Sequence, residues 1–273
     1  MRRQAFFLDA PGGGRFCLVT WPEGPPVGCI LHVHPFAEEL NKARRMAALA
    51  ARAFAERGWV VLQMDLFGCG DSAGDFRDAS WADWLDDLSL AWALLATLCA
   101  APTVVWTVRA GSLLAADWLA SHEGRSPALL MWQPVTNGRQ HLTQFLRLKA
   151  AGEMLVDGDA KVAMANMRTD LESGRAVEVA GYNLSPQLAS GLDAATLRLP
   201  PSYQASVGVL EVCGGDRVEA SPALRVLQQK WGESGIDVEL DVLSGPAFWQ
   251  TQEIETVPAL ADRSTAWLDR LLS

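Results

Sequence analysis

Ionisable side chains directly follow several apolar segments of this sequence. His34, Glu38 and Glu39 follow the segment 27–33, and Arg109 follows the segment 102–108. Carboxylates and imidazoles can take a proton from an attacking water, and a guanidinium can stabilise an oxyanion. The same groups can hold an anion, because a guanidinium binds carboxylate or phosphate through two parallel hydrogen bonds. The candidate catalytic residues are Arg109, His34, Glu38, Glu39 and Asp216, and the candidate ligand-binding residues are Lys42, Arg44, Asp65, Gln133, Trp249 and Glu253.

One serine has the local pattern of a hydrolase nucleophile. Gly70–Asp71–Ser72–Ala73–Gly74 matches the string G-x-S-x-G. In serine hydrolases that string forms a sharp turn between a strand and a helix. Here Gly68, Gly70 and Gly74 predict a turn-rich loop instead. We expect the Ser72 hydroxyl to brace this loop rather than to attack a substrate.

Apolar runs alternate with helical periods along most of the chain. Strands are predicted for 15–20, 27–33, 59–65, 102–108, 127–133, 207–212 and 236–243. Helices are predicted for 41–57, 80–99, 111–122, 221–234 and 256–272. Asn41 and Ser80 are expected N-caps, and Gly58 is expected to end the first helix. This alternation predicts an α/β fold with a mostly parallel sheet and helices on both faces.

The alternation is interrupted in one interval, 135–205. It contains amphipathic pieces such as LTQFLRLKAAGEML and breakers such as Gly181 and the Pro200–Pro201 pair. An interval of about 70 residues is too long for a single loop in a compact domain. We therefore expect one domain over 1–273, with a helical cap at 135–205 inserted between two core strands. Such a cap covers the carboxyl ends of the strands, where ligands of open α/β sheets bind.

This order of elements resembles the α/β-hydrolase fold over the whole chain. LHVHPF (31–36) stands at the place of the oxyanion loop, and DLFGCGDSAG (65–74) is similar to the D-x-x-G-x-G-x-S-x-G turn of that fold. CGGDRV (213–218) stands where the acid of the triad often lies. More closely, HVHPFAEELNKARR, GYNLSPQLA and GPAFWQTQEIE resemble the second of two exosortase A system-associated hydrolases, a bacterial family linked to exopolysaccharide production and protein sorting. The resemblance implies a hydrolase of ester, thioester or amide bonds.

The chain departs from the serine-hydrolase pattern at two positions. The nucleophile elbow reads Thr107–Val108–Arg109–Ala110–Gly111, and a guanidinium stays protonated and cannot attack a carbonyl. The histidines are His32, His34, His122 and His141, so none lies in the last 132 residues, where the catalytic base of this fold stands. Trp249 is close to that place. Asp216 could be the retained acid or a turn-capping residue.

Three functions are compatible with these residues. In a hydrolase, Glu38, Glu39 or Asp65 would activate water beside Arg109, and His34 would be either a base or a structural group of the oxyanion loop. In a binding protein, Arg109 and Lys42 would hold a small anionic ligand.

The third function is interaction with a protein partner through exposed tryptophans or the cap.

If no ligand binds at Arg109, its guanidinium would have to form an internal ion pair with Glu253 or Asp216, because an unpaired buried guanidinium is too costly.

The composition of the chain excludes several classes of protein. The 273 residues include 23 basic and 32 acidic side chains, a formal charge of −9, which argues against a nucleic-acid partner. No membrane span or signal peptide is expected. Five scattered cysteines without a C-x-x-C pair indicate reduced thiols and a cytoplasmic protein. No cofactor and no metal are expected, because the nucleotide-binding glycine motifs and Cys/His ligand spacings are missing. The oligomeric state stays open.

Overall fold

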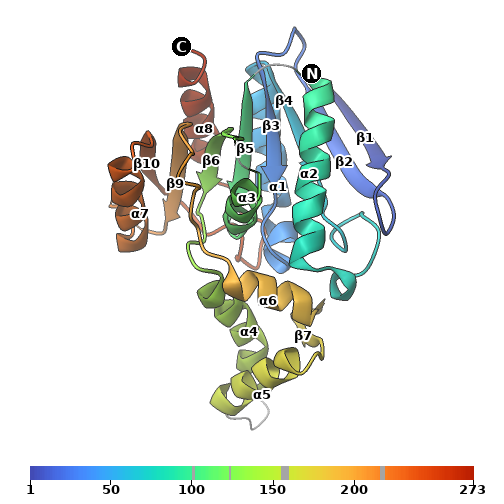
Figure 1. The fold of residues 1–273 in the computed structure, drawn as a ribbon. Helices are drawn as coiled ribbons and strands as arrows, with labels where there is room; N and C mark the ends of the chain where they lie inside the picture. The colour runs from blue at the N-terminus through green and yellow to red at the C-terminus, as the bar shows by residue number, and fades with distance from the viewer. Residues whose placement is uncertain (100–101, 123, 155–159, 216–218) are drawn as a thin grey trace.

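A central eight-stranded sheet organises the molecule (Figure 1). The structure, a computed structural model, describes residues 1–99, 102–122, 124–154, 160–215 and 219–273. The strands in spatial order are β1 (Arg2–Leu8), β2 (Arg15–Trp21), β4 (Trp59–Met64), β3 (Gly28–Val33), β5 (Thr103–Val108), β6 (Ala128–Trp132), β9 (Val207–Cys213) and β10 (Val238–Ser244). Pairing is parallel from β4 to β10 and antiparallel between β1, β2 and β4. The predicted mostly parallel sheet is confirmed.

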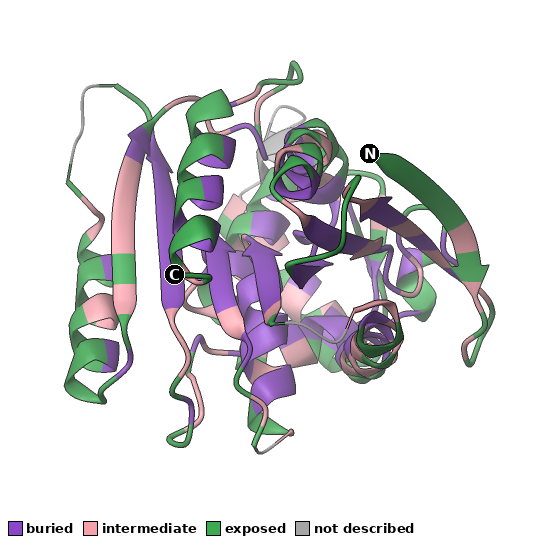
Figure 2. Cartoon of the chain, turned by 90° about the horizontal axis from the view of Figure 1, so that it is seen from above, coloured by how far each residue is buried: buried purple, intermediate pink, exposed green. Residues whose placement is uncertain are grey.

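Helices cover both faces of the sheet, which explains the continuous apolar runs of its strands. Ile30, Trp106 and Leu130 pack with α1 (Glu38–Glu56) and α8 (Pro258–Arg270) in one core. The adjacent residues on the same strands face α2 (Trp81–Leu98) and α3 (Gly111–Ala120), while α7 (Pro222–Glu233) packs on β10. Figure 2 shows the buried strands between helices whose outer sides are exposed. Two-sided burial removes the alternation that a half-exposed strand would show.

Two helix ends were predicted well and one was not. Ser80 is the N-cap of α2 and accepts a hydrogen bond from the Asp83 N–H, and Gly58 follows α1 with a φ of 93°. The prediction that Asn41 caps the first helix is wrong, because α1 already begins at Glu38. A sharp turn at Ala37, with φ at 47°, starts the helix directly after the preceding loop. Strand β1 was not predicted, because most of its residues are exposed and show no buried period.

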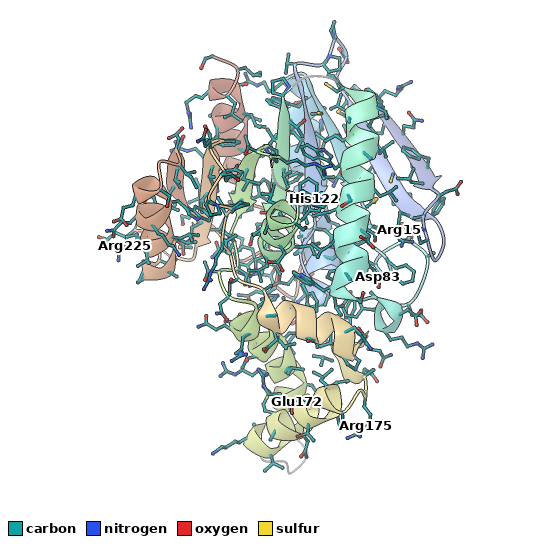
Figure 3. The ribbon with its side chains drawn as sticks, viewed as in Figure 1. Arg15, Asp83, His122, Glu172, Arg175 and Arg225 are labelled. Carbon is teal, nitrogen blue, oxygen red and sulfur yellow. The ribbon has the colours of Figure 1, made fainter. Side chains whose placement is uncertain are left out.

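The interval between β6 and β9 holds a group of elements that we call the cap. It contains α4 (Gly138–Met154), α5 (Ala160–Glu172), the hairpin β7 (Val177–Val179) and β8 (Tyr182–Leu184), and α6 (Pro186–Ala194). Figure 1 shows the cap beyond the carboxyl ends of the parallel strands, and Figure 3 places Glu172 and Arg175 at its far end. Ser185 ties the cap to the sheet domain, because its hydroxyl donates to the Ala79 carbonyl over 2.5 Å. The short hairpin was not anticipated in an otherwise helical insertion.

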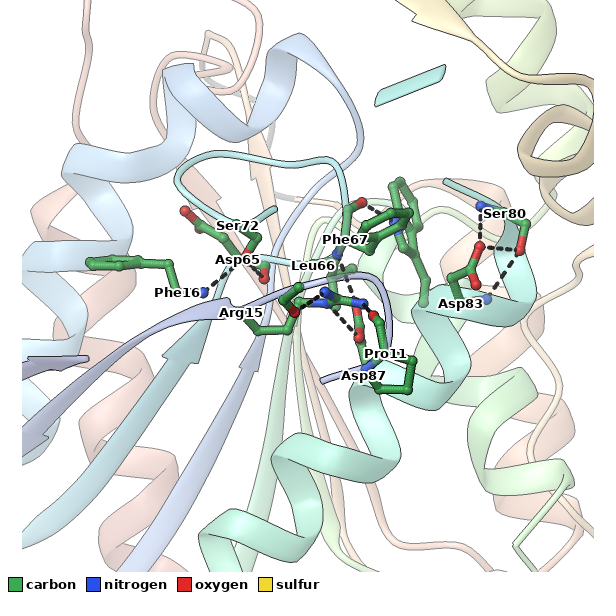
Figure 4. A network of polar contacts seen from close by, with 12 residues as sticks. Pro11, Arg15, Phe16, Asp65, Leu66, Phe67, Ser72, Ser80, Asp83 and Asp87 are labelled. Atoms are coloured by element: carbon green, nitrogen blue, oxygen red, sulfur yellow. Dashed lines mark hydrogen bonds and ion pairs between the residues drawn. The ribbon is translucent and has the colours of Figure 1, made fainter. Parts of the chain in front are cut away.

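A buried ion pair holds the loop after β4 (Figure 4). Arg15 Nε donates to Asp87 Oδ1 over 2.7 Å, and the two side chains are 4% and 3% exposed. Asp87 Oδ2 accepts the Phe67 N–H at 2.7 Å, and the Arg15 guanidinium stacks 4.5 Å from the Phe67 ring centroid. Sequence reasoning did not find this pair, because its members lie 72 residues apart. Among the helices described, none is long and apolar enough to cross a membrane.

Candidate active site

The turn between β5 and α3 has the geometry of a nucleophile elbow. Arg109 occupies it with a φ of 54°, a left-handed conformation that non-glycine residues rarely adopt. Its N–H donates to the Trp132 carbonyl at 2.9 Å, and its own carbonyl accepts the Val135 N–H at 3.3 Å. A Cβ on Gly111 would lie 2.5 Å from the Val33 carbonyl oxygen, so only glycine allows α3 to start this close to β3. The strained turn therefore presents the Arg109 side chain at the carboxyl edge of the sheet.

Three groups of the chain hold the Arg109 guanidinium. Nε donates to Glu39 Oε1 over 3.1 Å, and Nη1 donates to the Gln133 carbonyl over 3.4 Å. The guanidinium carbon lies 5.1 Å from the Trp249 ring centroid, which is within cation–π range. The Arg109 side chain is 14% exposed and that of Glu39 is 8% exposed, so this is a largely desolvated ion pair.

The partner of Arg109 differs from the predicted ones. Glu253 is exposed and forms no hydrogen bond or ion pair with Arg109 in the described part of the chain, so the predicted pairing with Glu253 is wrong. Glu39 takes its place because the first turn of α1 lies beside the elbow. The other predicted partner, Asp216, lies outside the described residues, and so its role as triad acid or capping residue stays a prediction.

Burial changes the proton affinity of both glutamates on the first turn of α1. Desolvation raises the pKa of Glu39 to about 7, although the Arg109 charge acts in the opposite direction. Burial also raises the pKa of the half-buried Glu38. The Oε2 atom of each is buried and has no hydrogen-bond partner in the described part of the chain. Glu39 is therefore a group that gains or loses a proton near neutral pH.

A cavity of about 430 Å³ lies between this edge of the sheet and the cap. Its lining combines charged groups from the sheet domain with cap side chains: Phe36, Glu38, Glu39, Lys42, Arg109, His141, Gln144, Phe145, Leu148, Ala180 and Gln250. Lys42 Nζ donates to the Gln250 carbonyl over 3.1 Å, which ties α1 to the segment after β10. The cavity thus brings together four of the predicted site residues, Arg109, Glu38, Glu39 and Lys42, with Trp249 against the guanidinium.

Sequence reasoning missed the cap residues of the cavity. His141 on α4 is buried, burial lowers its pKa to about 3, and its Nδ1 has no partner in the described residues. The imidazole is therefore neutral. The only signal in the sequence was a histidine within a predicted amphipathic helix of the cap. The direction of the His141 side chain depends on how α4 packs against the sheet, which the sequence does not show.

His34 is a structural group. Its Nε2 accepts the Leu66 N–H at 3.3 Å, so the proton lies on Nδ1, which donates to the Pro35 carbonyl at 2.8 Å. Burial lowers its pKa. Both ring nitrogens are engaged, and His34 does not line the cavity at Arg109. Of the two roles considered for it, the geometry supports the structural one.

Two further candidates lie at a different place. Arg44 Nη2 donates to Asp65 Oδ2 over 3.0 Å, and the same carboxylate oxygen accepts the Asp71 N–H at 3.0 Å. Both side chains line a second cavity of about 200 Å³, together with His32 and His34. Asp65 is thus not placed to activate water beside Arg109.

Gln133 contributes through its backbone. Its side-chain Oε1 accepts the Val212 N–H at 2.7 Å and so links β6 to β9, while its carbonyl contacts Arg109. Its φ of 45° accommodates both bonds. Gln133 was a candidate ligand-binding residue, but its side-chain oxygen bonds within the sheet and it does not line the cavity at Arg109.

The serine hydroxyls near the site are both used in structural hydrogen bonds. Ser72 Oγ donates to the Asp65 carbonyl at 2.5 Å and accepts the Phe16 N–H at 2.8 Å, as expected for a hydroxyl that braces the loop. Ser112 Oγ donates to the carbonyls of Arg109 and Val135, at 2.8 and 3.1 Å. Neither serine lines the cavity at Arg109. No cluster of metal-ligating side chains occurs in the ranges that the structure describes.

Comparison with known proteins shows the family of this chain. The family model of the serine aminopeptidases, S33, matches residues 24–196. The chain belongs to this family of α/β hydrolases. No curated protein matches it in sequence.

Solved structures share the fold of this S33 chain at low sequence identity. Est1E from Butyrivibrio proteoclasticus with bound ferulic acid has a TM-score of 0.66 at 17% identity, covering 97% of this chain and 98% of its own. A thermostable carboxyl esterase from Bacillus coagulans in complex with glycerol has a TM-score of 0.64 at 14% identity, covering all of both chains. XC6422 from Xanthomonas campestris, a serine hydrolase without a lid, has a TM-score of 0.59 at 14% identity, covering 98% and 94%. These likenesses confirm the predicted α/β-hydrolase fold.

Proposed function

We propose that this α/β hydrolase has lost the serine mechanism and binds a small anionic ligand at Arg109. The observation that carries the proposal is the guanidinium on the left-handed turn, with the Trp249 indole against it. A nucleophile has to stand at that turn, and a guanidinium has no electron pair for attack. The neighbouring hydroxyls of Ser72 and Ser112 are engaged in structural hydrogen bonds.

The size and the lining of the cavity favour a ligand-binding site over a former active site that an internal ion pair has closed. It has about 430 Å³ of space, within the usual range of small-molecule sites, and it combines aromatic walls with a few polar groups. Lys42 adds a second cation beside Arg109. The helix α3 starts directly after the elbow, and helix N-termini favour negative charge.

A second candidate function is hydrolysis without a serine. Glu39 has a pKa near 7, raised by burial, and lies 3.1 Å from a group that can stabilise an oxyanion. A carboxylate of this pKa suits general-base activation of water at neutral pH. Ester, thioester or amide substrates would all be possible, and turnover would depend on Glu39.

We further propose that the protein works in the cytoplasm with an exosortase and exopolysaccharide system. The support is the resemblance of three segments, 32–45, 181–189 and 245–255. These segments are distant in sequence but meet around the cavity: Lys42 contacts Gln250, and Asn41 Nδ2 donates to the Tyr182 hydroxyl over 3.0 Å. Cell fractionation, and the phenotype of a deletion on exopolysaccharide secretion, test this context.

The deciding experiment is a hydrolysis screen on short acyl esters and thioesters, with fluorophosphonate labelling as the test for an activated serine. We expect neither labelling nor turnover in the wild type, and a rise in melting temperature with anionic ligands. Turnover that survives Ser72→Ala but is lost in Glu39→Gln would replace the binding function by the serine-free hydrolase. Labelling that is lost in Ser72→Ala would refute both.

A further inference from the structure

The ion pair at the elbow leaves part of the guanidinium unused. Arg109 reaches Glu39 through Nε alone, and only Oε1 of Glu39 takes part. Arg109 Nη2 donates no hydrogen bond within the described residues, and Glu39 Oε2 is buried without a partner there. A bidentate carboxylate would use a guanidinium edge fully. The Arg109–Glu39 pair therefore has one hydrogen bond, whereas a ligand carboxylate could form two with the same guanidinium.

The charges around Glu39 limit the charge of the ligand. Glu38 and Lys42 face the cavity from α1, Arg109 from the elbow, and the neutral His141 from α4. With both glutamates ionised, their charge cancels that of Lys42 and Arg109. If Glu39 takes up a proton, the cavity has one positive charge in excess. That excess matches a monoanion, whereas a dianionic phosphate would leave the cavity negative.

The walls of the cavity limit the body of the ligand. Phe36, Phe145 and Leu148 supply aromatic and aliphatic surface to the same cavity as the charged groups. Such surface stabilises an apolar group of the ligand in proportion to the area it removes from water. A ligand with one charged end and a small apolar body satisfies both sides of the cavity.

We propose that the cavity binds a monocarboxylic acid with a small apolar body, which replaces Glu39 on Arg109 and enters together with one proton. This inference rests on the proposed ligand-binding function. The ligand carboxylate accepts from the Arg109 N–H groups, and Glu39, no longer paired, takes a proton from solvent on its carboxyl group. No other covalent bond forms or breaks.

Calorimetric titration of the full chain with benzoate tests this, in two buffers of different ionisation enthalpy from pH 6 to 8.5. We expect proton uptake to approach one per benzoate at pH 8, and Kd to rise about tenfold per pH unit above the pKa of Glu39. Glu39→Gln should abolish both the uptake and the pH dependence while keeping the low-pH affinity. Arg109→Met should lose binding, whereas Arg52→Met, an exposed arginine on α1, should not.

Benzamide, benzylamine and inorganic phosphate are the matched probes. Benzoate binding without proton uptake, or phosphate binding more tightly than benzoate, would overturn this inference and leave anionic ligand binding in place. Binding of benzylamine or benzamide alone, or of none of the probes, would overturn the proposed function as well. The proton uptake of the wild type decides the question even if Arg109→Met does not fold.

Discussion

Replacing Glu39 by glutamine should make the protein more stable at alkaline pH and leave its stability unchanged at acid pH. Burial raises the pKa of Glu39 from an ordinary value of 4.5 to about 7. Between these two values the folded chain keeps the proton that the unfolded chain has lost, so rising pH destabilises the fold. At about 1.36 kcal/mol per pH unit, the free energy of unfolding falls by roughly 3 kcal/mol between pH 4.5 and pH 8. Glutamine imitates the protonated carboxyl and removes this loss.

Urea denaturation followed by tryptophan fluorescence at pH 4.5, 6, 7 and 8.5 measures the effect. The stability difference between Glu39→Gln and the wild type should grow with pH and level off above pH 7. Glu56→Gln is the matched control on the same helix, because Glu56 pairs with Arg52 on the surface and its side chain is 56% exposed. A Glu39→Gln variant that is less stable than the wild type at pH 8.5 would show that the ion pair outweighs the desolvation of Glu39, and the reasoning would be refuted.

Three other variants test the remaining structural claims. Asp87→Ala should lower the free energy of unfolding by about 3–5 kcal/mol, since it leaves the buried Arg15 charge without its carboxylate, although the Gly13 and Pro11 carbonyls still accept from it; urea denaturation measures this, and a cost below that of Glu56→Ala would contradict it. Arg109→Ser should not become reactive to fluorophosphonates, because His141, the described histidine that lines the same cavity, is too weak a base to activate the new hydroxyl once burial lowers its pKa to about 3; labelling would contradict this. Ser72→Ala should cost about 1–3 kcal/mol by thermal denaturation and leave ligand binding unchanged, because its hydroxyl serves only the loop; a loss of binding would disagree.

The elbow keeps its strained backbone although the side chain on it is not a nucleophile. Arg109 adopts φ at 54°, and Gly111 still allows the close approach of α3 to β3. Left-handed conformations of non-glycine residues cost energy and occur where the surrounding structure determines them. Here the hydrogen bonds to Trp132 and Val135 maintain the turn, so the side chain can change while its direction is preserved.

Much of the fold follows from local patterns. The seven predicted strands coincide closely with observed ones, and five of them, β3, β4, β5, β6 and β9, are buried on both faces and so are continuous apolar runs. Ser80 and Gly58 mark helix ends through local hydrogen bonding and backbone freedom. The prediction of Asn41 as N-cap failed because α1 begins after the turn at Ala37. No side chain caps the helix there, so the sequence shows no capping residue at its true start.

The sequence by itself determined the identity of the residue at the elbow and the lack of a histidine after the last strand. Both can be located once the order of strands and helices is known. That order follows from local sequence patterns and needs no knowledge of tertiary contacts. Only the tertiary structure decided which groups meet: Glu39 rather than Glu253 pairs with Arg109 across 70 residues, His141 enters the cavity from the cap, and Asp65 lies in another cavity. The physical reason is that burial and ion pairing depend on distances through space, which the packing of α1 and the cap against the sheet sets.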